Sequence, residues 1–168
     1  MFELKPLDPQ AIPRALEKVE RYRLLNEPEE AESICLDILA IEPENQQAII
    51  TLLLALTDQF RSDDAAHCYA QARELLPRLR GDYERCYYTG LIFERRGSAQ
   101  IDRGGPGGLR NSYACLRQAM DWYEQAEALR PPDNDDAVLR WNTCVRMLAK
   151  HHLVPASEEE TFEPVLLE

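Results

Sequence analysis

The sequence predicts an all-α protein in which antiparallel helix hairpins follow one another as a solenoid, closed by a C-terminal capping helix. Three observations carry this prediction. A spaced set of alanine, a larger side chain and proline occurs three times along the chain. Proline and short polar residues stand where helices would begin and end. The chain has 168 residues, of which 45% are hydrophobic, enough for the core of one domain of ordinary size.

The three sets share one internal spacing, because the larger residue lies four positions after the alanine and proline eight positions after that. Alanine lets two helices approach closely, and the residue one turn later fills the space between hairpins. Proline then stops the second helix, since it lacks an N–H and clashes with the preceding turn. The sets are Ala31, Cys35 and Pro43; Ala65, Tyr69 and Pro77; and Ala119, Tyr123 and Pro131.

The distances between the sets indicate a repeat. Pro43 and Pro77 are 34 positions apart, and Pro131 follows Pro77 by 54, which is one such period with an insertion of 20 residues. The spacing resembles the tetratricopeptide repeat (TPR) family over residues 12–150. Tyr22 falls at the tyrosine position of that family's first helix. The resemblance implies three TPR-like repeats, at about residues 12–45, 46–79 and 80–134.

Local signals place the helices of the first two repeats. Pro13 suits a first helical turn, and Pro28 pre-sets the helix that follows the turn at residues 26–30. Ser62 is a plausible N-cap. The predicted helices cover residues 13–25, 29–41, 46–59 and 63–76, after a lead-in at residues 1–11.

The third repeat is expected to contain a helix over residues 82–96, the insertion, and a second helix that ends near Arg130. Asn134 or Asp135 caps the last helix, residues 135–151, which shields the open end of the stack. Residues 152–168 form an acidic tail.

The insertion, near residues 98–112, contains the run Gly104-Gly105-Pro106-Gly107-Gly108. No Gly-Lys-Ser/Thr follows it, so a phosphate-binding loop is disfavoured against a flexible tip between two lengthened helices. Five arginines against one acid make the surrounding segment locally basic. They either contact an acidic or phosphorylated partner or cover the helix sides and pair with neighbouring acids. We select Arg95, Arg96 and Arg103 as candidate contacts.

The net charge of −11 argues against binding to nucleic acid or an anionic membrane. With no visible signal segment, and a longest apolar run of only residues 48–56, we expect a soluble cytoplasmic protein. The five cysteines form no C-x-x-C pair, which disfavours disulfides and zinc. They are interpreted as small buried hydrophobes rather than reactive thiols or metal ligands.

The resemblance implies that the first helix of each repeat lines a concave groove. An apolar centre and mixed edges would suit an amphipathic helix or an extended apolar segment of a partner, unless these residues pack against the tail or a neighbouring hairpin. The lysine and asparagine that would clamp a terminal carboxylate are missing from this set. The predicted groove residues are Leu16, Glu20, Arg23, Gln47, Ile50, Leu54, Asp58, Glu84, Tyr88, Leu91, Ile92, Leu139, Thr143, Arg146 and Met147.

No catalytic constellation stands out. The chain contains three histidines, His67, His151 and His152, which neither accompany a recognisable nucleophile nor have the spacing of metal ligands. The acids at residues 133–136 lack the glycine and glutamate of a calcium-binding loop. We therefore expect no enzyme activity, no cofactor and no metal.

The tail, residues 156–168, mixes five acids with Phe162 and the trio Val165-Leu166-Leu167. It is interpreted either as disordered or as a short motif that occupies a groove in this chain or in another copy. The leading functional prediction is a non-enzymatic adaptor that binds another protein. The alternatives are an assembly or holding chaperone for a client and an accessory subunit of a larger enzyme complex.

Overall fold

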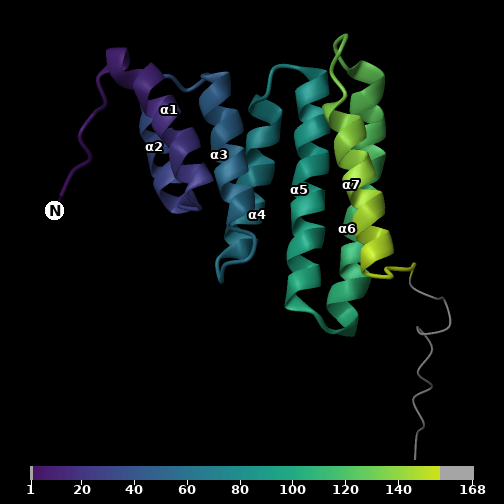
Figure 1. The fold of residues 1–168 in the computed structure, drawn as a ribbon. Helices are drawn as coiled ribbons and strands as arrows, with labels where there is room; N and C mark the ends of the chain where they lie inside the picture. The colour runs from purple at the N-terminus through teal and green to yellow at the C-terminus, as the bar shows by residue number, and fades with distance from the viewer. Residues whose placement is uncertain (1, 156–168) are drawn as a thin grey trace, which may run out of the picture.

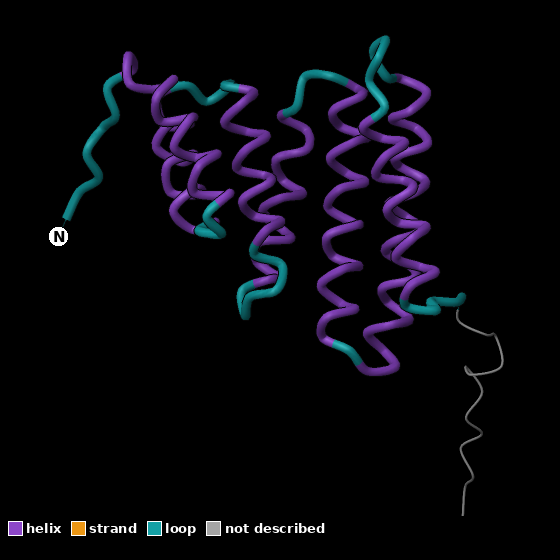
Figure 2. The backbone as a smooth tube through the Cα atoms, in the orientation of Figure 1, coloured by secondary structure: helices purple, strands orange, loops and turns teal. Residues whose placement is uncertain are grey.

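The computed structural model describes residues 2–155, and its regular structure over that range is entirely helical. Each α-helix packs against the next one along the chain, and successive helices alternate in direction (Figure 1). The turns lie at the helix ends (Figure 2). The all-α prediction is confirmed for this range. The elements are η1 (Pro9–Ala11), α1 (Ile12–Leu24), α2 (Pro28–Ile41), α3 (Gln46–Asp58), α4 (Ala65–Leu75), η2 (Leu76–Arg78), α5 (Asp82–Arg103), α6 (Gly105–Leu129) and α7 (Asp136–Lys150).

The helix boundaries follow the local signals closely. Pro28 is the first residue of α2, and the Asn45 side chain caps α3 by accepting a hydrogen bond from the backbone N–H of Ala48 at 2.9 Å. Pro43 and Pro131 follow the ends of α2 and α6 by two residues. The first four predicted helices therefore match α1 to α4 within about two residues, the usual uncertainty of a helix end.

The predicted insertion lengthens two helices. Helix α5 continues to Arg103 and α6 begins at Gly105, so only Gly104 separates them. Gly104 and Gly105 have φ of 71° and 78°, which reverses the chain without strain. Residues 98–112 otherwise belong to two lengthened antiparallel helices, as the sequence predicted, and the tip between them is short.

Close packing explains the glycines away from that turn. A Cβ at Gly97 would lie 3.1 Å from Cγ of Leu116, and one at Gly108 would lie 2.9 Å from the carbonyl oxygen of Gln100. A Cβ at Gly90 would lie 2.8 Å from the ring of Tyr123. Glycine at these positions lets α5 and α6 approach closely over their whole length.

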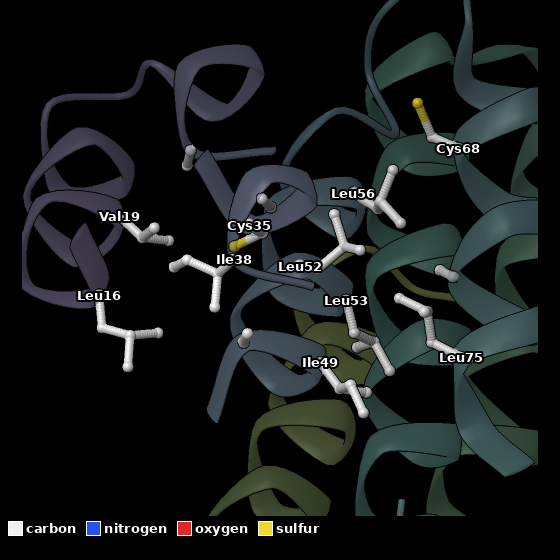
Figure 3. Close-up of a cluster of buried hydrophobic side chains, with 14 of the residues drawn as sticks. Leu16, Val19, Cys35, Ile38, Ile49, Leu52, Leu53, Leu56, Cys68 and Leu75 are labelled. Carbon is white, nitrogen blue, oxygen red and sulfur yellow. The ribbon is translucent and has the colours of Figure 1, made fainter. Parts of the chain in front are cut away.

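The buried side chains form two clusters. The first joins α1 to α4 and includes the large residues Val19, Ile38 and Leu53 (Figure 3). The second joins α5, α6 and α7 around Leu116 and Tyr123. Helix α5 contributes to both clusters, and therefore connects the two halves of the molecule.

The repeated set of residues has a clear packing role. Ala31 and Cys35 of the first set, and Ala119 and Tyr123 of the third, are all fully buried. Tyr69 of the second set is half-buried and packs on the first cluster. Among the described helices, none combines the length and apolar character needed to cross a membrane.

Candidate binding groove

A hollow of about 690 Å³ opens between the odd-numbered helices α1, α3 and α5. These helices are brought together because each hairpin places its first helix on the same side, where α1 contacts α3 and α3 contacts α5. Ile50 and Leu54 of α3 are half-buried in this hollow, and Leu24 of α1 stands at it with 89% of its surface exposed. The lining comprises Glu20, Arg23, Leu24, Asn26, Gln47, Ile50, Thr51, Leu54, Asp58, Arg61 and Arg95.

Asp58 organises one end of this hollow. Its Oδ2 accepts a hydrogen bond from Nε of Arg23 at 2.8 Å, and its Oδ1 accepts one from Nη1 of Arg95 at 3.4 Å. A carboxylate at the C-terminal end of α3 is disfavoured by the helix dipole, and the two guanidinium groups offset that cost. One carboxylate shared by two arginines leaves this end positively charged by one unit.

Arg61 lies in the loop after α3 and brings a third guanidinium to the same end. It forms an ion pair with Asp102 and donates a hydrogen bond from Nη2 to Oγ of Ser98 at 2.8 Å, and both partners belong to α5. The contact ties the loop to α5 and leaves the Arg61 side chain 49% exposed.

A second hollow, of about 500 Å³, adjoins the first and shares Glu20 and Gln47 with it. It begins at the N-terminal ends of α1 and α3. We call the two hollows together the inner groove. The second hollow is lined by Pro9, Ile12, Pro13, Leu16, Glu17, Glu20, Glu42, Asn45 and Gln47.

The inner groove gathers much of the predicted set. The six predicted residues of α1 and α3 other than Leu16 line the first hollow, and Leu16, although only 8% exposed, lines the second. Sequence reasoning missed Leu24, Asn26, Thr51 and Arg61 in the first hollow, and Pro9, Ile12, Pro13, Glu17, Glu42 and Asn45 in the second. Leu24 and Asn26 were missed because they stand where α1 ends, and Arg61 because it lies in a loop.

The predicted contribution of α5 needs correction. Leu91 and Ile92 are each 1% exposed and belong to the interior, because α5 is packed on both sides. Tyr88 is half-buried against the first cluster, where burial raises its pKa to about 12. Glu84 is not part of the inner groove either. Arg95 is the residue through which α5 reaches it.

The predicted contribution of α7 also needs correction. Leu139, which is 61% exposed, and Arg146 lie on α7, which packs against α6 and α5 at the opposite end of the helix array from α1 (Figure 1). Met147 packs on the second cluster, and Thr143 donates its hydroxyl to the Leu139 carbonyl. These residues do not line the inner groove.

The other two selected arginines face α4. The Arg96 guanidinium lies 4.1 Å from the ring centroid of Tyr69, a cation–π contact. Arg103 lines a small pocket with Tyr69 and Phe60. These placements agree with arginines that cover the sides of neighbouring helices.

A buried polar network lies on the other side of α5. Glu94 is 4% exposed, and its Oε2 accepts a hydrogen bond from the Tyr123 hydroxyl at 2.6 Å. Its Oε1 accepts one from Nη1 of Arg140 at 3.1 Å, so α5, α6 and α7 meet at one carboxylate. Burial and the neighbouring Glu94 carboxylate raise the pKa of Tyr123, which therefore stays protonated and donates.

The cysteines are free thiols, and Cys35, Cys68 and Cys144 are buried. Burial raises the pKa of the Cys144 thiol to about 12, and also raises that of Cys35 and Cys68. Neutral buried thiols are poor nucleophiles, which fits their interpretation as core residues. Within residues 2–155, no three histidine, cysteine or acidic side chains gather as a metal site would require. Residues 156–168 of the acidic tail lie outside the described residues.

Comparison with known proteins found no family model, no curated protein and no solved structure that matches this chain.

Proposed function

We propose that this protein is a non-enzymatic helical-repeat adaptor that binds a polypeptide segment of a partner protein in the inner groove. The observation that carries the proposal is the groove itself. It has apolar side chains at its centre, charged groups at both ends and walls made from successive hairpins. Such a surface suits an amphipathic segment, whose apolar side would cover Ile50 and Leu54.

The arrangement of hairpins supports a TPR-like solenoid as the scaffold. Three features favour it: the 34-residue spacing, the burial of the repeated alanines Ala31 and Ala119, and α7 packed over the last hairpin. In such a solenoid the first helices of the repeats share one face, and this is the face on which the inner groove lies.

The groove has the dimensions of a short helix. From Pro13 to Leu24, α1 advances about 17 Å at 1.5 Å per residue, so a bound helix of about 11 residues would span it. We expect a partner segment with leucine-like side chains three and four positions apart, because that spacing places them on one helical face.

Site-specific photo-crosslinking tests the proposal. A photoreactive side chain at Leu24, at the rim of the inner groove, is expected to crosslink a partner polypeptide in extract of the source cell. The same group at Leu139 on α7 is the matched control, since both leucines are highly exposed. Equal crosslinking of one partner at both positions would contradict the proposal.

Substitution of the groove provides a second measurement. Leu54→Glu is expected to reduce recovery of the crosslinked partner at least about tenfold, whereas Leu139→Glu leaves recovery unchanged. Circular dichroism of both variants confirms that they remain folded. Recovery that is insensitive to Leu54→Glu would exclude the groove as the binding surface.

A further inference from the structure

The charges of the inner groove are separated along its length. At the N-terminal ends of α1 and α3 the lining carries the acids Glu17, Glu20 and Glu42 and no basic residue. Toward the C-terminal ends it carries Arg23, Arg61 and Arg95 around Asp58, and Glu20, which lines both hollows, lies between these arginines and the acidic end. Helices α1 and α3 run in the same direction (Figure 1), so their N-terminal ends lie on one side of the groove and their C-terminal ends on the other.

The separation is short enough to act on one bound segment. Glu17 and Arg23 are six residues apart on α1, which corresponds to about 9 Å along the helix axis. That distance is close to the Debye length of about 8 Å at physiological salt. The charges at one end of the groove are therefore largely screened from the other end, and each end acts on the nearest part of a bound segment. Ile50 and Leu54 lie between the two ends on α3 and supply the apolar contact.

Internal pairing leaves each end with an uncompensated charge. At the basic end, Arg23 and Arg95 share Asp58, and Arg61 remains half-exposed in its ion pair with Asp102. At the acidic end, Glu42 accepts a hydrogen bond from the neutral Asn45 side chain at 2.7 Å, which preserves its negative charge. The groove therefore presents a negative end and a positive end to its occupant.

We propose that the inner groove binds its partner segment in one orientation only, with basic residues near Glu17 and Glu42 and acidic residues near Arg23 and Arg95. This inference rests on the proposed function and specifies the partner as a charge-polarised amphipathic helix. Such a helix begins with lysine or arginine, has leucine-like residues in its middle and ends with acidic residues.

Three synthetic peptides of about 12 residues test the orientation, the length that fits the groove. All have the same central leucines at helical spacing. One has lysines at the N-terminal end and glutamates at the C-terminal end, the second has these charges exchanged, and the third has glutamine at both ends. Binding to the full chain is measured by isothermal titration calorimetry.

We expect the first peptide to bind roughly tenfold more tightly than the second at low salt, because several exposed charge pairs change from attraction to repulsion. The difference is expected to shrink at about 0.5 M salt, where exposed charges are screened. Equal affinity of the two charged peptides, together with binding of the glutamine peptide, would overturn the orientation and leave the proposed function standing. Failure of all three peptides to bind would overturn both.

A charge-reversal variant ties the preference to the groove. The double variant Glu17→Arg and Glu20→Arg is expected to abolish or invert the preference between the two charged peptides. Glu30→Arg on α2 with Glu74→Arg on α4 is the matched control, since these exposed glutamates lie outside the inner groove and the net charge changes equally. If both double variants reduce the preference equally, the preference depends on the overall charge of the protein and the proposal is overturned.

Discussion

The hydrogen bond between Tyr123 and the buried Glu94 carboxylate predicts how much stability the variant Tyr123→Phe loses. This substitution keeps the ring, which is fully buried, and removes only the hydroxyl that donates to Glu94 at 2.6 Å. Water cannot readily replace that donor, since Glu94 is 4% exposed. A hydrogen bond to a charged group contributes about 1.5–3 kcal/mol, so we expect the free energy of unfolding to fall by about 2 kcal/mol.

Tyr83→Phe is the matched control. The Tyr83 hydroxyl donates a hydrogen bond to the neutral Oδ1 of Asn134 at 3.2 Å, and this bond joins α5 to the segment that leads into α7. Unlike Tyr123, Tyr83 is only half-buried. Loss of a neutral, partly hydrated bond is expected to cost about 1 kcal/mol or less. Urea unfolding of both variants, followed by circular dichroism, measures the difference. If Tyr123→Phe costs no more than Tyr83→Phe, the buried carboxylate does not depend on this hydroxyl and the reasoning is refuted.

Two further predictions concern packing and pH. Gly90→Ala is expected to lower the free energy of unfolding, because the new Cβ would lie 2.8 Å from the Tyr123 ring. Gly107→Ala meets nothing within 4 Å and is expected to raise the free energy of unfolding by about 0.5–1 kcal/mol through helix propensity. Thermal unfolding compares the two variants, and a change of the same sign in both would contradict the packing argument. The Cys144 thiol has an ordinary pKa of 9.0 and one of about 12 in the folded protein, so above pH 9.0 the unfolded chain releases a proton that the folded chain retains. The stability that the Cys144 thiol contributes is therefore fully present below pH 9.0 and is lost as the pH rises toward 12. The contribution of Tyr88 changes with pH in the same direction. Urea unfolding midpoints that stay constant up to about pH 10.5 would contradict this prediction.

Local chemistry was sufficient to predict the helices of the first two hairpins. Proline at the helix starts and after the helix ends acts within a few residues, so the sequence alone contains these signals, whereas the predicted cap Ser62 does not cap α4, whose N-cap is Asp64. The face of α1 and α3 that lines the inner groove was indicated by the resemblance to the TPR family, from which these residues were carried over by position.

The failures arise from contacts between distant residues. The sequence did not show the packing role of Gly97 and Gly108, which only their contacts with Leu116 and Gln100 reveal. Glu94 was not predicted as a buried group, because its partners Tyr123 and Arg140 lie 29 and 46 positions away. The same applies to Leu91, whose burial depends on packing on both sides of α5.

Two consecutive residues of α5 contact different neighbouring helices. Arg95 reaches Asp58 in the inner groove, while Glu94 holds α6 and α7 through Tyr123 and Arg140. Any change that rotates or shifts α5 therefore moves one wall of the groove and one anchor of the last two helices together. Variants of Glu94 are therefore expected to change the affinity of the inner groove for the partner proposed above, although Glu94 does not line that groove.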